Sequence, residues 1–173
     1  MSAVIEGHHD DHHHGPAKGI TRWLYTTNHK DIGSLYLWFS FIMLFIGGAM
    51  AMVIRAELFE PGSQIVSPEF YNQMVTNHGL IMVFGVIMPA FVGLANWLIP
   101  MQIGAPDMAL PRLNNLSFWI LPAAFGVLLA TFFMEGGAPN FGWTFYAPLS
   151  TEYAPPTVTY FIFAVHIMGA SSI

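Results

Sequence analysis

Long uncharged stretches alternate with short polar segments along this chain. The first runs from Ile32 to Ile54, the second from Phe70 to Pro106 and the third from Leu113 to Met134, and a fourth apolar segment extends from Thr157 to Ile173. An uncharged helix of about 20 residues crosses the hydrocarbon core of a bilayer, which is about 30 Å thick. The pattern therefore predicts about four transmembrane helices. The second run is long enough for a tilted span plus re-entry into an interface.

The segments between the runs are rich in residues that end helices. Glu60, Pro61 and Gly62 follow the first run, Gly104 and Pro106 end the second, and a Gly/Pro-rich aromatic loop over 135–156 follows the third. The fourth segment has no polar exit, which predicts a stop within a helix of a longer bundle. Alternating strands of a membrane barrel are not seen. Since helices satisfy their own backbone groups in lipid, we expect an all-α integral membrane protein, a multi-span helical bundle.

Residues 1–19 differ in composition from the rest of the chain. Two carboxylates, Asp10 and Asp11, lie there among five imidazoles, those of His8, His9, His12, His13 and His14. The missing apolar content predicts a disordered His-rich tail, with the bundle domain covering 20–173. Weak zinc or nickel binding by the imidazoles is the alternative. The tail has neither the basic start nor the apolar stretch of a signal peptide.

Composition narrows the class of protein. Only 9% of the residues are Asp, Glu, Lys or Arg, against about 25% in an average soluble domain, and the mean hydropathy is +0.53. These values exclude a disordered chain and argue against an ordinary soluble domain. The net charge of −5 offers no basic footprint for nucleic acid. With no cysteine, disulfides, iron–sulfur clusters and thiolate metal sites are excluded.

The basic residues predict how the bundle is oriented. Those on one side of the predicted spans are Lys18, Arg22, Lys30 and Arg112. Arg55 alone lies on the other side, beside several glutamates, and the last loop has no basic residue. By the positive-inside rule, the N-terminus faces the cytoplasm (or the matrix).

Two histidines lie within the predicted spans, where an ionisable residue is expensive unless it has a function or a partner. His78 has Met82 and Gly85 on the same helix face, and Gly79 or Gly85 would leave space for a flat ligand. Neutral imidazole without thiolates suits haem iron or copper. A structural His78, bonded to a carbonyl of a neighbouring helix, is an equal alternative. His166 has no ligating neighbour at helical spacing, so a structural role is favoured for it.

Polar groups gather near one mouth of the predicted bundle. Asp107 lies between Asn96 on one side and Asn114 and Asn115 on the other, an arrangement that can admit protons. Taken alone, Asp107 is better explained as a partner of Arg112 or a cap of the third helix.

A second polar group lies at the other end of the first span. Arg55 closes that span at about the height of His78, where it can bind lipid phosphate or a cofactor's oxygens. Glu57, Glu60 and Gln64 follow, and such oxygen ligands suit calcium, although three are too few to be specific.

The order of these motifs along the sequence indicates a protein family more specifically than any single motif does. The informative blocks are Thr27–Gly33, Arg55–Leu58, His78–Met82, Asn96–Trp97, Ile103–Ala109, Pro111–Trp119, Gly142–Thr144 and Gly169–Ile173. From about Thr21 to its last residue, the chain resembles the N-terminal third of subunit I of the haem–copper oxygen reductases, specifically a bacterial aa3-type cytochrome c oxidase. The resemblance implies that the four spans belong to a larger subunit of about twelve helices.

The resemblance implies roles for residues near the outer face. His78 would be one axial ligand of the low-spin haem a, and Arg55 would bind the formyl group of that haem. Trp143 and Tyr146 would lie by the haem propionates. The positions matching an outer calcium site are Glu57, Glu60, Gly62 and Gln64. The residues that bind copper and the second haem, and the residue that forms the opposite axial ligand of haem a, would lie in parts of the subunit that this chain does not contain.

The resemblance also implies a proton pathway from the inner face. Asp107 would be its entrance, Asn96 and Asn114 would line its start, and Ser171 and Ser172 would continue it. The whole enzyme would oxidise cytochrome c, reduce O2 to water and pump protons across a bacterial inner membrane as a multi-pass protein. Its partners would be membrane lipid, the rest of subunit I, subunits II and III, and cytochrome c.

Three alternatives remain open at this point. One is a quinol-oxidising relative in the same superfamily. Another is a non-catalytic membrane module in which His78 and His166 bind haem together. The third is a transport or scaffold bundle without a cofactor.

Overall fold

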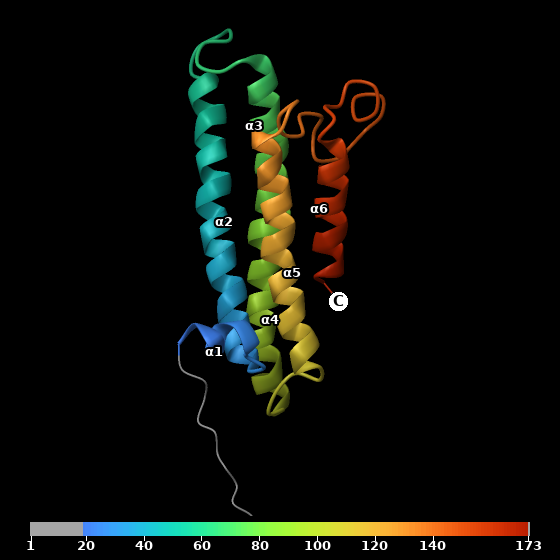
Figure 1. Cartoon of the computed structure of the whole chain (residues 1–173). Helices are drawn as coiled ribbons and strands as arrows, with labels where there is room; N and C mark the ends of the chain where they lie inside the picture. The colour runs from blue at the N-terminus through green and yellow to red at the C-terminus, as the bar shows by residue number, and fades with distance from the viewer. Residues whose placement is uncertain (1–18, 173) are drawn as a thin grey trace, which may run out of the picture.

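The computed structural model describes residues 19–172 as helices joined by loops, with no strand among them (Figure 1). The elements in chain order are α1 (Ile20–Tyr25), α2 (His29–Glu57), α3 (Pro68–Leu80), η1 (Ile81–Ile87), α4 (Met88–Ile103), α5 (Pro111–Ala130), η2 (Thr131–Phe133) and α6 (Val158–Ala170). Residues 1–18 and 173 lie outside the described part of the chain, so the predicted His-rich tail and its metal-binding alternative stay untested.

Three helical stretches within residues 19–172 are long and apolar enough to cross a membrane. They are His29–Glu57 with 29 residues, Pro68–Ile103 with 36 and Pro111–Phe133 with 23. The three corresponding predictions are confirmed. The fourth predicted span corresponds to α6, an apolar helix of 13 residues, which is shorter than a full crossing. Many large apolar side chains point outward from the bundle, as they do where lipid is the solvent.

Consecutive long helices run in opposite directions (Figure 1). The start of α2 and the loop between α4 and α5 lie at one end of the bundle, called here the inner end. The loop after α2 and the loop over 134–157 lie at the opposite, outer end. These are the same two groups of loops that the basic residues in the sequence assign to opposite sides of the membrane.

The second predicted span is a single continuous helical stretch, Pro68–Ile103. Its middle, Ile81–Ile87, is a π-helix, which the sequence did not predict. Pro89 lies two positions after its end and has no N–H to offer a carbonyl one turn earlier. The Ser40 hydroxyl of α2 donates to the carbonyl oxygen of Val86 at 2.8 Å and so satisfies one group of this widened segment.

Two glycines bring α2 and α4 close together. A Cβ on Gly93 would lie 2.9 Å from the carbonyl oxygen of Gly33, and a Cβ on Gly33 would lie 2.6 Å from Cδ1 of Trp97. Small residues at such contacts let two helix backbones approach within a membrane bundle. On another side of α2, Tyr36 and Phe39 pack edge-on against Phe118 of α5. These contacts fix how the polar inner ends of three helices meet.

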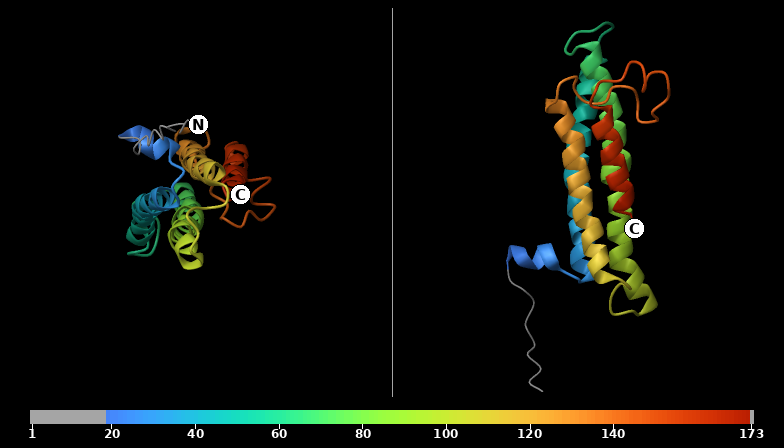
Figure 2. Two further views of the ribbon diagram at one scale, coloured as in Figure 1. Left: turned by 90° about the horizontal axis from the view of Figure 1, so that it is seen from below. Right: turned by 45° about the vertical axis from the view of Figure 1, so that its right-hand side comes forward.

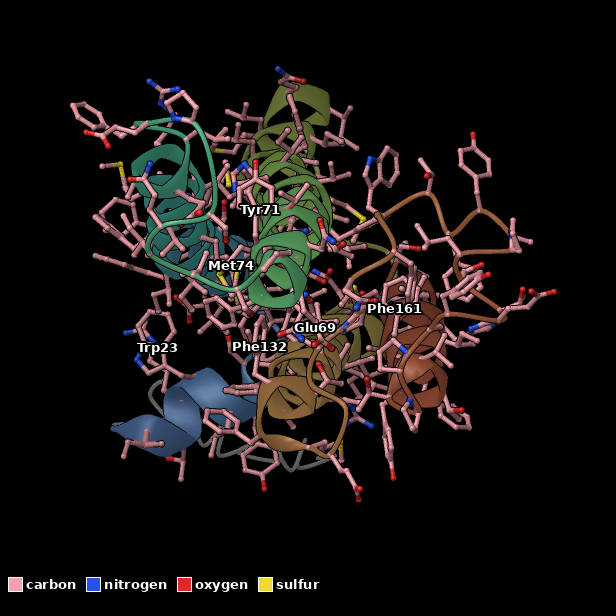
Figure 3. The ribbon with its side chains drawn as sticks, turned by 90° about the horizontal axis from the view of Figure 1, so that it is seen from above. Trp23, Glu69, Tyr71, Met74, Phe132 and Phe161 are labelled. Atoms are coloured by element: carbon pink, nitrogen blue, oxygen red, sulfur yellow. The ribbon has the colours of Figure 1, made fainter. Side chains whose placement is uncertain are left out.

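The short helix α1 lies across the inner end of α2 (Figures 1 and 2). Arg22 holds it there through an ion pair of 2.7 Å with Asp31 in the first turn of α2. The hydrogen bond that Arg22 donates to the Asp31 carboxylate, and the negative charge of that carboxylate, raise the pKa of the Arg22 guanidinium. Seen from above in Figure 3, Trp23 of α1 lies at the edge of the bundle, and the buried Met74 lies on the side of α3 that faces α2.

Candidate functional site

His78 is half-buried on α3 and is held by the neighbouring helix. Its Nδ1 donates to the carbonyl oxygen of Gly47 in α2 at 2.9 Å. This is the bond that a structural histidine would make. It is also the bond that most metal-ligating histidines make with their second nitrogen, because it fixes the tautomer and leaves Nε2 as the ligand. The geometry therefore fits both roles and identifies Nε2 as the atom that would bind iron.

The space beside His78 differs from the sequence-based expectation. A Cβ on Gly85 would lie 3.0 Å from Cζ of Phe125, so Phe125 of α5 already fills the space that this glycine leaves. Gly79 faces the indole of Trp143, whose Cδ1 would lie 3.4 Å from its Cβ. The expectation that Gly85 leaves room for a flat ligand is therefore wrong, because α5 packs there. Trp143, in contrast, does lie next to the turn that carries His78.

Arg55 lies further out than His78. It is eight residues beyond Gly47 on α2, which corresponds to about 12 Å along the helix axis. The expectation of equal height is wrong for the two backbones. The Cα–Cβ bonds of a helix tilt toward its N-terminus, which for Arg55 is the direction of the level of His78. Its guanidinium is exposed at the outer end of the bundle.

The aromatic residues of the outer loop are mostly exposed. Trp143 is 51% and Tyr146 is 74% exposed. Trp143 also lines an apolar groove of about 360 Å³ between the second long helix and α6, together with Leu80, Phe84 and His166. The structure thus places Trp143 beside Gly79 and in the wall of this groove, and leaves Tyr146 on the loop surface.

The two histidines do not share a site. Nδ1 of His166 donates to the carbonyl oxygen of Ile162 in its own helix at 2.8 Å. The groove that His166 lines is formed on the side of Leu80 and Phe84, whereas His78 contacts α2. Positions 78 and 80 point about 200° apart around a helix. This arrangement argues against a haem held jointly by the two imidazoles.

Asp107 binds the start of α2. Its Oδ1 accepts the backbone N–H of His29 at 3.2 Å and that of Met108 at 2.7 Å. Within residues 19–172 it makes no ion pair with Arg112. The structural alternative foreseen for Asp107 is therefore wrong in its partner, because the carboxylate caps the first long helix and not the third.

A chain of hydrogen bonds leads from this point into the bundle. His29 donates from Nδ1 to the carbonyl oxygen of Asn96 at 2.7 Å, and Asn114 donates from Nδ2 to Oδ1 of Asn96 at 2.5 Å. Ser117 donates to the carbonyl oxygen of Asn114 at 2.9 Å, and the hydroxyl of Tyr36 lies 3.2 Å from that of Ser117. All five side chains are buried or half-buried. The structure therefore brings Asn96 and Asn114 into direct contact, as the sequence implied.

Three residues of this hydrogen-bonded network were not identified from the sequence. His29 and Ser117 occur in two of the recognised blocks, and Tyr36 lies in the first uncharged run, but none was assigned a role. Tyr36 and Ser117 lie seven residues into α2 and six residues into α5. A polar group at that depth on each of two neighbouring spans was the available signal.

Ser171 and Ser172 are not part of this hydrogen-bonded network. Ser171 is buried and donates to the carbonyl oxygen of Met168 at 2.6 Å, and Ser172 donates to that of Gly169 at 2.7 Å. Both bonds stay within α6 and the residues that cap it. No hydrogen bond found among residues 19–172 joins either serine to Ser117.

The outer acidic loop is organised by Glu57. This buried carboxylate accepts the backbone N–H groups of Gln64, Ile65 and Val66 at 2.8, 2.8 and 2.9 Å. Glu60, like Gly62 and Gln64, is exposed. In the part of the chain that the structure describes, no three His, Asp or Glu side chains are grouped to hold a metal ion. The calcium site therefore stays a prediction.

Comparison with known proteins decides the family. The family model described as "Cytochrome C and Quinol oxidase polypeptide I" matches residues 31–173. The chain belongs to this family. The match covers every candidate site residue named above except His29, which lies two positions before it. Subunit I of this family is a membrane protein of haem–copper oxidoreductases in respiratory electron transport, so the resemblance seen in the sequence is confirmed.

Individual relatives come from bacteria and from an archaeon. The chain is 45% identical over 163 residues to "Cytochrome c oxidase subunit 1" of Corynebacterium diphtheriae, which is 92% of this chain and 29% of that protein. It is 48% identical over 143 residues to the protein of the same name from Corynebacterium efficiens (82% and 25%). It is also 48% identical over 139 residues to "Heme-copper oxidase subunit I+III" of Aeropyrum pernix (80% and 17%). The chain thus spans less than a third of the length of these relatives.

Proposed function

We propose that this chain is part of the catalytic subunit of a respiratory terminal oxidase that oxidises cytochrome c, reduces O2 to water and pumps protons. Its own contribution is one axial ligand of the low-spin haem and the start of a proton pathway. The observation that carries this proposal is the bond from Nδ1 of His78 to Gly47, which leaves Nε2 as the free ligand atom. The family and the named relatives support the reaction.

The side-chain chemistry of the residues around His78 suits a haem. His78 would hold the iron through Nε2, Arg55 would donate to the formyl oxygen, and Trp143 and Tyr146 would lie by the propionates. When bound, the haem supplies reversible one-electron chemistry at its iron. The carbonyl of Gly47 keeps the imidazole in one orientation, and the exposed Arg55 cation offers planar donors to an oxygen. Copper and a second haem would be bound by other parts of the complete protein.

The hydrogen-bonded network of polar side chains at the inner end supports a proton pathway. Asp107 would take protons from the inner aqueous phase, because one of its oxygens is used by two backbone N–H groups and the other has no partner within residues 19–172. Asn96, Asn114, Ser117 and Tyr36 would then orient the water molecules along which protons move. Ser171 and Ser172 would serve a later part of the same pathway on α6.

The two sites lie at different depths, and this separation supports coupling to a membrane potential. His78 contacts α2 at Gly47, whereas Asp107 contacts α2 at its first residue, His29. Eighteen positions of helix correspond to about 27 Å. Moving one charge across a full membrane potential of 100 mV takes about 2.3 kcal/mol. A proton entrance and an electron carrier set this far apart are what such coupling requires.

The setting of the complete protein follows from the same proposal. We expect a multi-pass protein of a bacterial inner membrane, with residues 1–19 as a tail on the cytoplasmic side. Its partners would be the rest of subunit I, oxidase subunits II and III, and cytochrome c. Oxidation of reduced cytochrome c, but not of a quinol, by the purified complex would distinguish this reading from that of a quinol oxidase.

The haem assignment is tested by His78→Ala in the full-length subunit, with His166→Ala as the matched control. We expect His78→Ala to abolish the low-spin haem absorbance and His166→Ala to retain it. Loss of the absorbance in both variants would support the two-histidine module instead. An unchanged spectrum in His78→Ala would overturn the ligand assignment.

A further inference from the structure

A groove that no haem or proton role uses lies between α2 and α4 near the inner end. It encloses about 370 Å³, and its lining residues are Ser34, Leu37, Trp38, Phe41 and Trp97. This set is called the α2–α4 groove below. A volume of this size is typical of sites for small organic ligands. The groove is almost wholly apolar, with Ser34 as its main polar side chain.

The groove faces away from the rest of the bundle. Its α2 residues Ser34, Trp38 and Phe41 lie on one helix face at spacings of four and three, roughly opposite the face of Tyr36 and Phe39 that packs on α5. Trp38 is 63% and Phe41 50% exposed. Within the described residues, the α2–α4 groove is therefore open on the side of α2 that faces away from α5.

A cation stands at the inner end of the same face. Lys30 precedes Ser34 by four residues, so the two side chains are neighbours on α2. The ammonium of Lys30 lies 5.6 Å from the centre of the Trp97 ring, and the indole N–H of Trp97 donates to the Ser34 hydroxyl at 3.2 Å. Gly33 allows this arrangement, because a larger residue there would collide with Trp97. The tryptophan is thus fixed between a cation and a hydroxyl.

The neighbouring cation on this side is already engaged. Arg22 donates to both oxygens of Asp31 at 3.1 and 2.7 Å, so its charge is matched within the chain. Lys30 contacts only the uncharged Trp97 ring and is exposed. Its positive charge has no carboxylate partner among residues 19–172. An anionic group approaching the inner end of the α2–α4 groove therefore meets Lys30.

Along the α2–α4 groove the chemical order is a cation, then the Ser34 hydroxyl bonded to the indole of Trp97 from α4, then aromatic and aliphatic surface. A phospholipid has the same order, with a phosphate, a polar glycerol region and an acyl chain. We propose that the α2–α4 groove binds an anionic phospholipid, with its phosphate on Lys30 and one acyl chain along Trp38 and Phe41. Lysines near a membrane surface attract anionic lipid, and tryptophans anchor at the level of the headgroups.

The charge at the end of the groove favours lipid over a further protein helix as the occupant. A protein helix would have to place a carboxylate beside Lys30 within the interface, whereas an anionic lipid brings its phosphate to that depth by its own structure. The proposal does not depend on haem binding or on the reaction, since it uses none of the residues assigned to them.

Lipid retention by the full-length protein, purified from membranes with its partner subunits, tests the proposal. The complex is exchanged into a mixture of phosphatidylglycerol and phosphatidylcholine with identical acyl chains, and retained lipids are counted by native mass spectrometry. We expect Lys30→Gln to weaken retention of phosphatidylglycerol about fivefold, which corresponds to about 1 kcal/mol for one lysine, and to leave phosphatidylcholine unchanged. Lys30→Arg should retain phosphatidylglycerol as the parent protein does.

Two further variants separate the charge from the groove. Trp38→Ala should lower retention of both lipids, because it removes a wall of the groove, and its exposed position makes misfolding a small risk. Arg112→Gln, an exposed cation of the same side, and Phe91→Ala, a 68% exposed aromatic of α4, are the matched controls and should change neither lipid. Unchanged phosphatidylglycerol retention in Lys30→Gln and Trp38→Ala would overturn the proposal and indicate that protein covers the groove. Equal loss in Lys30→Gln and Arg112→Gln would also overturn it, because the effect would then be one of general charge.

Discussion

The backbone N–H of His29 donates to Oδ1 of Asp107 at 3.2 Å, across 78 positions of sequence. The imidazole of the same histidine donates to the carbonyl oxygen of Asn96. One residue at the start of α2 therefore links the middle of α4 with the loop that follows that helix. The carboxylate proposed as the proton entrance also fixes the geometry of that entrance, and the two roles can be separated by substitution.

Asp107→Asn separates them, because the amide oxygen of asparagine can accept the same two backbone N–H groups. We expect the variant to fold and bind haem normally in the full-length protein while turnover slows and proton pumping is lost, since an amide does not exchange a proton with water as a carboxyl group does. The measurement is the ratio of protons pumped to electrons transferred. A normal ratio in this variant would refute the assignment of Asp107.

Asp107→Ala is the companion variant, and it removes both functions. Because it also removes the cap of α2, we expect a loss of stability of about 1 kcal/mol in addition to the slower turnover. Thermal unfolding of the two variants side by side measures the difference. Equal stability of Asp107→Asn and Asp107→Ala would show that the bond to His29 contributes little.

The contact between Asn96 and Asn114 predicts a coupling energy. Asn114→Ala leaves the Oδ1 of the buried Asn96 without its donor, which costs about 1–3 kcal/mol. The double variant with Asn96→Ala should lose less than the sum of the two single losses, because the orphaned group is then removed as well. A double-mutant cycle on the free energy of unfolding measures this coupling. Strict additivity would mean that the two amides are independent.

Close packing of α2 on α4 predicts a strong effect of one added methyl group. Gly93→Ala places a Cβ within 2.9 Å of the carbonyl oxygen of Gly33, so the helices must separate. We expect a loss of about 1–3 kcal/mol of stability and, since His29 would move away from Asn96, slower proton uptake. Gly126→Ala in α5 is the control, because its Cβ would meet nothing within 4 Å, and it should be neutral or slightly stabilising.

Much of the fold could be predicted from the sequence. The uncharged runs are long, and their length is set by the thickness of the bilayer, so the three long helices were found within a few residues. The grouping of Lys30 and Arg112 on one side and Arg55 on the other was also readable, because helices that alternate in direction place alternate loops together. The π-helix at Ile81–Ile87 was not readable, since it depends on which carbonyls neighbouring helices satisfy.

The candidate sites were only partly predictable. Asn96 and Asn114 were chosen from their motifs, and they do meet. The partner of Asp107 was not predictable, because a carboxylate in a loop can cap any helix that begins nearby, and only the packed bundle brings His29 to it. The space beside Gly85 was misjudged for the same reason, since Phe125 comes from a different helix.

The role of Glu57 in holding the outer loop can be tested without any assumption about the reaction. Its two oxygens accept three consecutive backbone N–H groups, from Gln64 to Val66, and such charge-assisted bonds are stronger than neutral ones. Glu57→Gln keeps the shape but replaces one acceptor by a donor that opposes these N–H groups. We therefore expect faster amide hydrogen exchange at Gln64, Ile65 and Val66, measured in the full-length protein, while Glu60→Gln, an exposed control, leaves it unchanged.

A chelator distinguishes this account of the loop from a calcium site. If Glu57 holds the loop directly, EDTA should not alter exchange at residues 64–66, because the carboxylate already has its donors within the chain. If Glu57, Glu60, Gly62 and Gln64 instead bind calcium, EDTA should accelerate exchange in the parent protein, and added calcium should reverse the effect. Glu60→Gln would then act like the chelator, since it would remove one of the ligands. The two accounts thus predict different responses of the same three amides to EDTA: no change in one case and faster exchange in the other.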